Sequence, residues 1–387
     1  MSLAKKYPSV ADMAAGAAKR MPKFVHEYMI GGIMDESCVQ RNRSDLNNVK
    51  LMPRYLQEAQ RPDISTTVLG QTFDAPFGIA PLGLSGLMWP NLEHILARSA
   101  KQHNIPYTLS TYACVSLEDI RKSGGNNTWF QYYPSDTPEI EQDLLDRCKN
   151  AGYKTLVLTV DIPVETVRYR DAKSGLSVPP DFFDLRTLWQ MVTHPAWSLT
   201  MLRHGIPQFK TLERYYGPGP KIPASVEFIS KHMKGHITAA RFKDIRAAWD
   251  GNLIVKGVLD VAEAETYMGL EADGIQVSNH GGRQFDAAPT PVEMLPAIRE
   301  ALGPSALILA DGGVRNGLDI ARMIALGANF VMMGRPFVYA VAAIGSQGGS
   351  HVMQILKEEL AMTLAQMGCQ HLSSLPEHVI NLAQRGQ

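Results

Sequence analysis

A histidine and an arginine with the chemistry for proton transfer and carboxylate binding stand close together late in the chain. His280 and Arg283 flank two glycines within Ser278–Asp286 (SNHGGRQFD), and Lys256 closes an otherwise apolar run. An isolated histidine is more often a packed or solvated residue, but a nearby arginine and a position at a strand end favour a general base. A buried lysine requires an anionic partner. This pattern therefore predicts acid–base chemistry on an anionic substrate.

Two glycine-bearing segments farther along the chain carry arginines. Asp311–Arg315 (DGGVR) and Gly334–Pro336 (GRP) each follow an apolar run. Glycines let backbone N–H groups approach an anion closely, and Arg315 and Arg335 add positive charge. An Asp-Gly-Gly run by itself would equally suit a tight turn. Because two such segments carry arginines near the end of the chain, we interpret them as a phosphate site.

Polar side chains also end the earlier apolar runs. They are Ser110, Gln131 with Tyr133, and Thr159 with Asp161. Taken alone, Asp161 would serve as well as a helix cap. Because the carboxyl ends of barrel strands meet on one face, we treat all of these residues as candidates for the same site.

Short apolar runs alternate with helical stretches along the chain. Strands of this kind separated by helices indicate a parallel sheet that is covered on both faces, and eight units favour a (β/α)8 TIM barrel. A doubly wound open sheet is the alternative, disfavoured because no G-x-G-x-x-G follows the first run. The expected strands are Phe77–Pro81, Tyr107–Thr111, Trp129–Tyr133, Thr155–Asp161, Leu253–Gly257, Gly274–Asn279, Leu307–Asp311 and Phe330–Gly334. The expected helices include Leu92–His103, Pro138–Ala151, Val261–Leu270, Pro291–Leu302 and Gly317–Leu326.

We expect a single domain over residues 1–387, with two segments outside the barrel. Residues 1–76 form an N-terminal extension, with helices at Val10–Arg20 and Pro22–Ile30 followed by irregular and short strand structure. The segment between the fourth and fifth strands, about residues 165–250, is far longer than an ordinary connection. Such an insertion is typical of a lid, a binding loop or an interaction element.

The composition excludes several classes of protein. The 38 Lys and Arg residues balance 38 Asp and Glu residues, so the chain lacks the basic excess of a nucleic-acid-binding protein. Four separated cysteines without a C-x-x-C pair argue against a disulfide framework and a structural zinc site, and favour a reducing, cytoplasmic location. We read no signal peptide and no apolar run long enough to span a bilayer.

The motifs together resemble the FMN-dependent L-2-hydroxy-acid oxidase/dehydrogenase family, which includes glycolate oxidase, lactate oxidase and mandelate dehydrogenase. SNHGGRQFD resembles the family signature, and independent matches are TLS at 108–110, FQYY at 130–133, LTVD at 158–161, VKG at 255–257, DGGVR at 311–315 and GRP at 334–336. The resemblance implies an FMN-containing barrel that oxidises a small L-2-hydroxy acid, L-lactate-like in preference, to the 2-oxo acid. It also implies a homotetramer or homo-octamer.

The resemblance implies a cofactor role for each matching residue. Lys256 would face N1 and O2 of the flavin, where negative charge develops on reduction. The backbone of Pro81, Leu82 and Gly83 would lie near N5. The isoalloxazine would be hydrogen-bonded by Ser110, Gln131 and Thr159, with Ser278 also assigned to the cofactor, and the phosphate would be held by Asp311, Gly313, Arg315, Gly334 and Arg335.

The resemblance also implies roles on the substrate side. Arg283 and Arg168 would hold the carboxylate, because a guanidinium can bind it bidentately. His280 would remove the proton from the 2-hydroxyl group or from C2, and Asp161 would stabilise the imidazolium that results. The hydrogen-bonding partners of the substrate would be Tyr28 and Tyr133.

Two features bear on the electron acceptor and on substrate size. The cofactor-facing turn reads Pro81-Leu82-Gly83, where oxidases of the family often end in alanine, so glycine favours a dehydrogenase that uses a quinone or another acceptor. The alternatives are an oxidase that uses O2 and releases H2O2, and a mandelate-type dehydrogenase. Tyr112 suggests a lactate- or glycolate-sized substrate, although a displaced ring would admit a larger one.

The long insertion contains an apolar stripe at helical spacing. Leu185, Leu188, Trp189 and Val192 recur at i, i+3, i+4 and i+7, with cations nearby. The segment at about 177–215 resembles the membrane-attachment segment of mandelate dehydrogenase and predicts peripheral contact with the inner face of the cell membrane. The alternatives are a helical pair packed on the barrel or a neighbouring subunit, and a disordered lid.

Two other classes of protein fit parts of the pattern. A flavin-free, phosphate-binding aldolase or isomerase would use Lys256 to form a Schiff base, but it gives no role to Arg168, His280 and Arg283 together. A flavin barrel that serves only as a binding or scaffold protein would not require every candidate catalytic position to be filled.

Overall fold

The fold is built around a closed parallel barrel. The computed structural model describes residues 2–56, 61–164, 166–176, 184–217, 222–233 and 236–380. The barrel strands lie in the order β10-β3-β4-β5-β6-β7-β8-β9, so the eight predicted strands and the barrel are confirmed. Their bounds are β3 (Phe77–Ile79), β4 (Tyr107–Ser110), β5 (Thr128–Tyr132), β6 (Thr155–Thr159), β7 (Asn252–Val258), β8 (Gly274–Val277), β9 (Ile308–Ala310) and β10 (Phe330–Met333).

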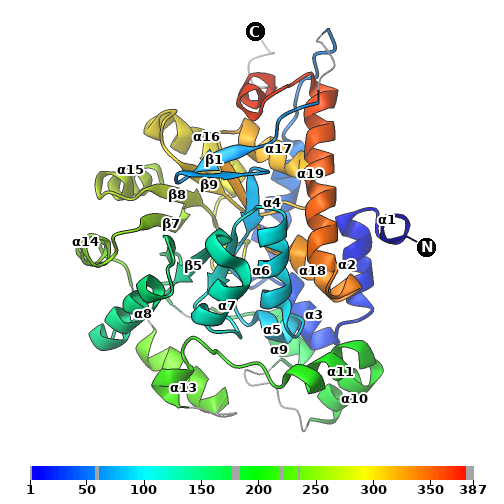
Figure 1. Cartoon of the computed structure of the whole chain (residues 1–387), viewed down its shortest axis with the longest axis vertical. Coiled ribbons are helices and arrows are strands. Elements are labelled where there is room, and N and C mark those ends of the chain that lie inside the picture. Colours follow the sequence, from blue (N-terminus) through cyan, green and yellow to red (C-terminus); the bar gives the residue numbers. More distant parts are fainter. Residues whose placement is uncertain are drawn as a thin grey trace.

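Helices surround the barrel and cover the outer face of its strands (Figure 1). The predicted helices are found within two residues of their expected ends. Their amphipathic spacing, which marks the face that each helix buries, is a pattern that the sequence shows directly. The helices that follow strands are α5 (Ser85–Met88), α6 (Leu92–Gln102), α7 (Leu117–Gly124), α8 (Pro138–Asn150), α15 (Val261–Gly269), α16 (Pro291–Leu302), α17 (Gly317–Ala325) and α18 (Arg335–Ile344), with α19 (Gly348–Met367) after them and short 3-10 turns η1 (Gly125–Asn127) and η2 (Leu372–His378).

The barrel interior is closed at the end where the strands begin. A hairpin of β1 (Thr66–Val68) and β2 (Gln71–Phe73) lies across that end, and the Phe73 ring sits 6.2 Å from Trp129 and 5.9 Å from Phe330. These rings belong to a buried apolar cluster that fills the barrel. Filling the interior leaves the carboxyl ends of the strands as the place for a site.

The N-terminal extension contains the expected helices and one that was not expected. Helices α1 (Leu3–Lys6), α2 (Val10–Ala18) and α3 (Lys23–Ile30) precede α4 (Ser37–Asn48), and α2 lies beside α18 (Figure 1). The prediction of irregular structure at 37–48 is wrong. Its sequence is strongly polar, and only Cys38, Asn42 and Leu46 are buried, at one position per turn, so the apolar signal for a helix is weak.

The insertion between β6 and β7 is helical. It contains α9 (Tyr169–Ser174), α10 (Leu185–Thr193), α11 (Pro195–His204), α12 (Glu213–Tyr216), α13 (Ile222–His232) and α14 (Ala239–Ala248). Residues 177–183, the first part of the predicted membrane segment, lie outside the described residues. Helix α11 docks through the buried Trp197, whose indole N–H donates to the carbonyl of Leu87 at 3.0 Å. The α10–α11 pair therefore packs on the barrel through α11.

Candidate active site

His280 and Asp161 form a half-buried pair beyond the ends of β8 and β6. The Nδ1 atom of His280 lies 2.9 Å from Oδ1 of Asp161. The backbone of His280 is left-handed, with φ 57°, an uncommon state for a residue other than glycine. Gly257 makes room for the carboxylate, because a Cβ atom there would come within 2.6 Å of Asp161. The two side chains are therefore held in one geometry by the ends of three neighbouring strands.

The environment of this pair suits a neutral histidine. Burial lowers the pKa of His280, although Asp161 acts against that shift. Burial would raise the pKa of Asp161, but the charges of His280 and Lys256 outweigh it and hold that pKa below its ordinary value. The arrangement gives an ionised aspartate that accepts a hydrogen bond from Nδ1 of a neutral imidazole. The Nε2 atom is then the acceptor and can serve as a base.

Lys256 lies beside this pair at the end of β7. Its side chain is buried, and Nζ is 3.3 Å from Oγ of Ser278 and 3.9 Å from carboxylate oxygens of both Asp161 and Asp311. Asp311 accepts a hydrogen bond from Ser278 at 2.8 Å and from Gln276 at 2.6 Å. The anionic partners that a buried lysine requires are thus present within the barrel.

A row of polar side chains crosses three neighbouring strands. Ser110 on β4 donates to Oε1 of Gln131 on β5 at 2.9 Å, and Nε2 of Gln131 donates to Oγ1 of Thr159 on β6 at 3.0 Å. All three residues are buried. Such a row presents alternating donors and acceptors, which matches the edge of a planar polar ring.

Arginines gather around the carboxyl end of α3. Nη1 of Arg283 donates to the carbonyls of Tyr28 and Gly31, at 2.9 and 2.7 Å. Arg335 donates to the carbonyls of Met29 and Gly31, at 3.1 and 2.9 Å. The guanidinium groups of Arg283 and Arg168 both approach the Tyr28 ring, at 5.1 and 5.9 Å from its centre. These cations are brought together by the end of one helix.

The arginine cluster favours an anion. Burial lowers the pKa of Arg283 to about 10, and the charge of Arg168 adds to this shift. Burial also lowers the pKa of Arg335, with repulsion from Arg315 and Arg283 as the next causes. Like charges held this close raise the free energy of the charged forms, so a bound carboxylate or phosphate relieves the repulsion.

The glycine-bearing loops form a cradle at the start of α18. Gly313 has φ 79°, and a Cβ atom there would meet the Asn42 carbonyl at 2.2 Å, so no other residue fits. Gly334 directly precedes Arg335, the first residue of α18, and the charge of Arg315 lies close enough to repel that of Arg335. This donor set fits a phosphate. Asp311, which was expected to join it, instead directs its carboxylate to Ser278 and Gln276.

Aromatic rings line the other side of the candidate site. Tyr133 stacks on Tyr112 with ring centres 4.7 Å apart, and Phe209 of the insertion meets Tyr112 edge-on at 5.9 Å. The Tyr28 hydroxyl donates to the carbonyl of Gly83 at 3.4 Å. Burial, followed by the nearby charge of Asp161, raises the pKa of Tyr133, so its hydroxyl stays a hydrogen-bond donor. The structure thus places the turn at 81–83 and the tyrosines near one another.

Several residues of the site were missed from the sequence. Gln276 orients Asp311, and Asn279 joins the loop to α4 through Asn42 at 3.0 Å. A signal existed for Gln276, since a glutamine interrupts an apolar strand that is buried on both faces. No sequence signal identifies the carbonyls of residues 28–31, because every residue carries one.

The His280–Asp161 geometry predicts the acid side of the pH profile. Because the neutral imidazole is the base and its pKa is lowered, kcat/KM should fall only as the pH drops below about 6.5. Asp161→Asn removes the charge that raises the pKa of His280, so this limb should move to lower pH while the plateau rate falls by about 100-fold or more. Stopped-flow rates across pH measure both. Asp119→Asn at the surface is the control, and an unchanged limb in Asp161→Asn would contradict the pairing.

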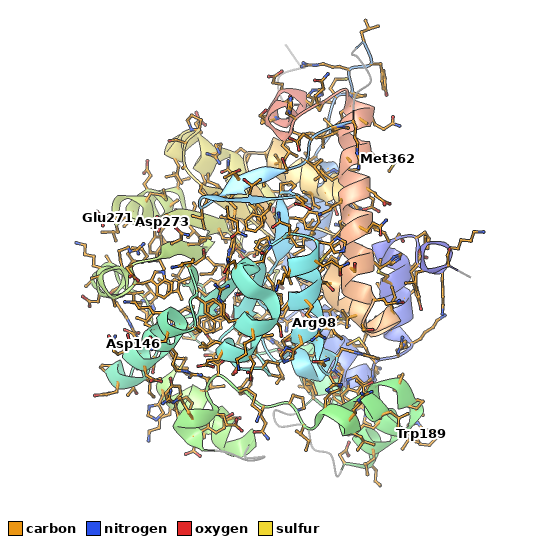
Figure 2. The ribbon with its side chains drawn as sticks, in the orientation of Figure 1. Arg98, Asp146, Trp189, Glu271, Asp273 and Met362 are labelled. Carbon is orange, nitrogen blue, oxygen red and sulfur yellow. The ribbon has the colours of Figure 1, made fainter. Side chains whose placement is uncertain are left out.

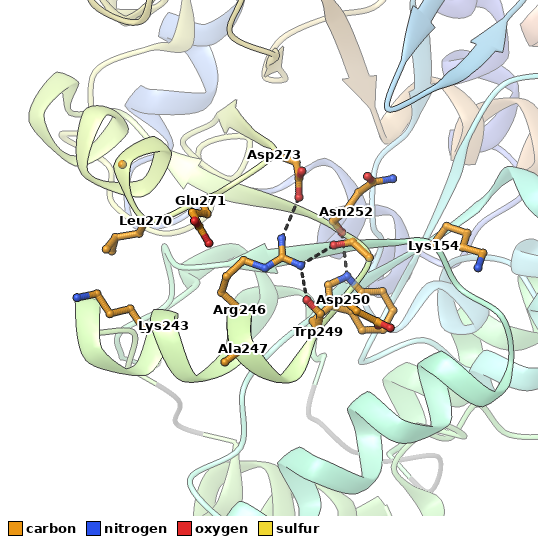
Figure 3. Close-up of a pocket in the computed structure, with 12 residues that line it drawn as sticks. Lys154, Lys243, Arg246, Ala247, Trp249, Asp250, Asn252, Leu270, Glu271 and Asp273 are labelled. Atoms are coloured by element: carbon orange, nitrogen blue, oxygen red, sulfur yellow. Dashed lines mark hydrogen bonds and ion pairs between the residues drawn. The ribbon is translucent and has the colours of Figure 1, made fainter.

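A separate groove lies at the opposite end of the barrel, where β7 begins (Figure 3). Arg246 donates to Asp273 at 2.9 Å and to the carbonyl of Gly251 at 2.7 Å. The charged side chains that line the groove are Lys154, Lys243, Arg246, Asp250, Glu271 and Asp273. The signs balance, and none of the candidate residues lies there.

Known proteins resemble the chain over nearly its whole length. The family model described as FMN-dependent dehydrogenase matches residues 17–382. L-lactate dehydrogenase of Chromohalobacter salexigens is 36% identical over 365 residues, which cover 94% of this chain and 93% of that protein. L-lactate dehydrogenase of Pseudomonas entomophila is also 36% identical, over 94% of this chain and 95% of the relative.

Solved structures extend the likeness to three dimensions. The crystal structure of (S)-mandelate dehydrogenase, described as a monotopic membrane protein, has a TM-score of 0.91 at 34% identity and covers 96% of this chain and 99% of its own. Mandelate oxidase has a TM-score of 0.82 at 29% identity, covering 97% and 98%. The chain therefore belongs to the FMN-dependent dehydrogenase family, and it is an oxidoreductase that acts on the CH–OH group of 2-hydroxy acids with FMN as its cofactor.

Proposed function

We propose that the chain oxidises a small L-2-hydroxy acid, L-lactate-like in preference, to the 2-oxo acid and passes the electrons to a quinone-type acceptor. The observation that carries this proposal is the placement of a histidine base, 2.9 Å from its aspartate, at the same end of the barrel as Arg283 and Arg168, whose guanidinium groups both approach the Tyr28 ring. A base together with a carboxylate clamp is what removal of hydrogen from C2 of a hydroxy acid requires.

The chain's own residues supply binding, orientation and proton transfer. Arg283 and Arg168 hold the substrate carboxylate, and Tyr133 donates its hydroxyl hydrogen to the substrate, with Tyr28 beside it. Nε2 of His280 takes up the proton, and Asp161 stabilises the imidazolium that forms. FMN, when bound, would take up the two electrons and the second proton that the substrate loses. Whether the proton comes from the hydroxyl group or from C2, the same base receives it.

We assign the cofactor contacts by the chemistry of each group. Gly313, Arg315, Gly334 and Arg335 suit the phosphate, because they combine close backbone approach with positive charge. Lys256 would stabilise negative charge on the ring, with Ser278 and Asp311 holding the lysine in place. The ring-facing groups would be Ser110, Gln131, Thr159 and the backbone of Pro81, Leu82 and Gly83.

The aromatic wall supports a small substrate. Tyr112 is fixed between Tyr133 and Phe209, so its ring narrows the space beside the clamp. The same rings would also stack on an aromatic side chain, and the mandelate enzymes among the structural relatives make an aromatic hydroxy acid the second candidate. L-lactate is favoured because curated relatives of that activity match at 36% identity.

A panel of L-2-hydroxy acids tests the substrate class. The FMN-loaded protein is mixed anaerobically with glycolate, L-lactate, D-lactate and L-mandelate, and the oxidised flavin band near ~450 nm is followed. We expect L-lactate to bleach the band fastest and D-lactate to leave it unchanged. A faster reaction with L-mandelate would support the second candidate, and no bleaching by any acid would contradict the proposal.

The electron acceptor is tested by following the reoxidation of the reduced flavin. A Cβ atom at Gly83 would meet only Tyr112 at 3.6 Å and Ser110 at 3.9 Å, so alanine would fit and glycine is not required for packing. We take the glycine as favouring a dehydrogenase. Colour should return faster with a soluble quinone than with air; fast return in air, with release of H2O2, would make the protein an oxidase.

We further propose peripheral contact with a membrane through α10 and α11. The apolar stripe of α10 faces outward: Leu185, Trp189 and Val192 are 82%, 69% and 71% exposed, while the polar Gln190 is buried and accepts from the backbone N–H of Phe24. Figure 2 shows Trp189 at the edge of the molecule. Within the described residues, none of the helices has both the length and the apolar character to cross a bilayer. Exposed apolar residues with Arg186 nearby suit a membrane interface.

The oligomeric state, a homotetramer or homo-octamer, stays a prediction.

Placing charge on this stripe should release the protein from membranes. Trp189→Glu together with Val192→Glu should lower binding to anionic vesicles by about 10-fold or more, because each glutamate replaces exposed apolar area that would enter the membrane with a charge that anionic lipid repels. Vesicle sedimentation of the FMN-loaded protein measures this. Met362→Glu, at a 60% exposed methionine on α19, is the matched control. Equal sedimentation of all three proteins would contradict the membrane proposal.

A further inference from the structure

The segment from Glu27 to Glu36, here called the collar, lies against the candidate site. Its carbonyls at residues 28–31 accept hydrogen bonds from Arg283 and Arg335. The collar also approaches the loop after β8, since the N–H of Ile33 donates to the Gly282 carbonyl at 3.2 Å. The collar therefore contacts the loop after β8 and the start of α18, which carry Arg283 and Arg335.

A third arginine binds the collar from the insertion. Arg170 on α9 presents a bidentate fork to Glu36, with Nε to Oε1 at 2.6 Å and Nη2 to Oε2 at 2.5 Å. Its remaining nitrogen, Nη1, donates to Glu27 at 2.5 Å. All three guanidinium nitrogens therefore donate to a carboxylate. Bidentate hydrogen bonds between charged groups are among the strong ones in proteins. The hydrogen bonds from Arg170 hold the pKa of Glu36 below its ordinary value, so the carboxylate is ionised.

The collar is shaped around this contact. Glu36 has φ 63° and Met34 has φ 47°, left-handed values that non-glycine residues adopt only when the surroundings favour them. Glu36 also accepts from the N–H of Gly32 at 3.1 Å, which closes the turn. The strained turn thus aims the Glu36 carboxylate at α9.

Arg168 depends on the same segment. Arg168 immediately precedes α9, and within the described part of the chain its guanidinium contacts the Asp171 carboxylate at 3.9 Å and the Tyr28 ring at 5.9 Å. Neither contact is short enough to fix a long side chain. The strong ionic contacts of α9 are made two residues later, by Arg170, to Glu36 of the collar and to Glu27 on α3, the helix that carries Tyr28.

We propose that Arg170 is a positioning residue that latches α9 to the collar through Glu27 and Glu36, and so holds Arg168 and Tyr28 at the spacing needed to bind the substrate carboxylate. The inference rests on the proposed substrate site. Arg170 itself touches neither His280 nor the cofactor-facing row in the structure, so it acts through Arg168.

Steady-state and binding measurements on the FMN-loaded protein test the latch. Arg170→Met should raise KM for L-lactate about 10-fold and weaken oxalate binding, read from the flavin spectrum, by a similar factor, while kcat changes by less than about 3-fold. Glu36→Gln should raise KM by a smaller factor. The double variant should have nearly the KM of Arg170→Met, because both changes remove the same interaction. The KM of Arg170→Lys should lie between those of the wild type and Arg170→Met, because lysine can reach only one carboxylate at a time. Arg246→Met, which removes an arginine–carboxylate contact at the opposite end of the barrel, is the control.

Hydrogen exchange gives a readout that does not depend on activity. Amides of residues 166–176 and 23–36 should exchange about 10-fold faster in Arg170→Met, with the strands β4 to β7 unchanged. Unaltered KM and exchange would overturn the inference, and so would faster exchange throughout the barrel with loss of FMN, which would indicate general destabilisation. If the wild-type protein oxidises none of the acids, the proposed function fails, while the exchange result still decides whether the latch exists.

Discussion

Replacing His280 with alanine should slow flavin reduction by at least about 10³-fold while FMN stays bound, because this change removes the base and nothing that holds the phosphate. The imidazole is placed by the left-handed backbone at 280 and by Asp161 at 2.9 Å. Among the described residues, the phosphate cradle of Gly313, Arg315 and Arg335 makes no hydrogen bond to the imidazole ring of His280. Anaerobic stopped-flow mixing with L-lactate measures the rate, and the flavin-to-protein absorbance ratio measures retention.

The matched control for this variant is His371→Ala, an exposed histidine near the carboxyl end. It should reduce flavin at the wild-type rate. Small amines or imidazole added to His280→Ala should restore part of the rate, since an external base can occupy the space. Reduction of His280→Ala at the wild-type rate would remove His280 from the mechanism.

The barrel and much of the candidate site could be predicted from the sequence because both depend on local patterns. Each strand is an apolar run that ends in a polar residue, and parallel strands place those ends on one face. His280, Asp161 and Lys256 come from three separate strands, yet the structure brings them within 3.9 Å of one another. The alignment of neighbouring parallel strands is what brings these three side chains together, so no knowledge of long-range contacts is needed to group them.

The remaining features depend on contacts that no local pattern encodes. An apolar stripe on α10 predicts an amphipathic helix but not which way it faces; that follows from Gln190, which is buried against the backbone of Phe24. Asp311 matches a phosphate-binding motif by position, although its carboxylate is bound by Ser278 and Gln276. Arg283 and Arg335 bind the collar through its carbonyls, which carry no residue-type signal. The Arg170 contacts join residues more than 130 positions apart, so no local pattern pairs them.

Replacing Arg283 with lysine should lower kcat and raise KM together, reducing kcat/KM about 100-fold or more. The guanidinium has two tasks in the structure. It faces the Tyr28 ring at 5.1 Å, in position for the substrate carboxylate, and its Nη1 holds the carbonyls of Tyr28 and Gly31. A lysine ammonium is a single point charge and cannot span both, so carboxylate binding and the placement of Tyr28 are lost at once.

The control separates these tasks from a general loss of stability. Arg299→Lys removes a guanidinium that likewise donates to backbone carbonyls, those of Gly327 and Gly303, and Arg299 lies away from the site. We expect it to lower the melting temperature as much as Arg283→Lys does, with kcat/KM unchanged. Rates with a substrate amide that lacks the carboxylate charge should fall far less in Arg283→Lys than rates with L-lactate. Equal losses for both substrates would show that Arg283 holds the collar and takes no part in binding the carboxylate.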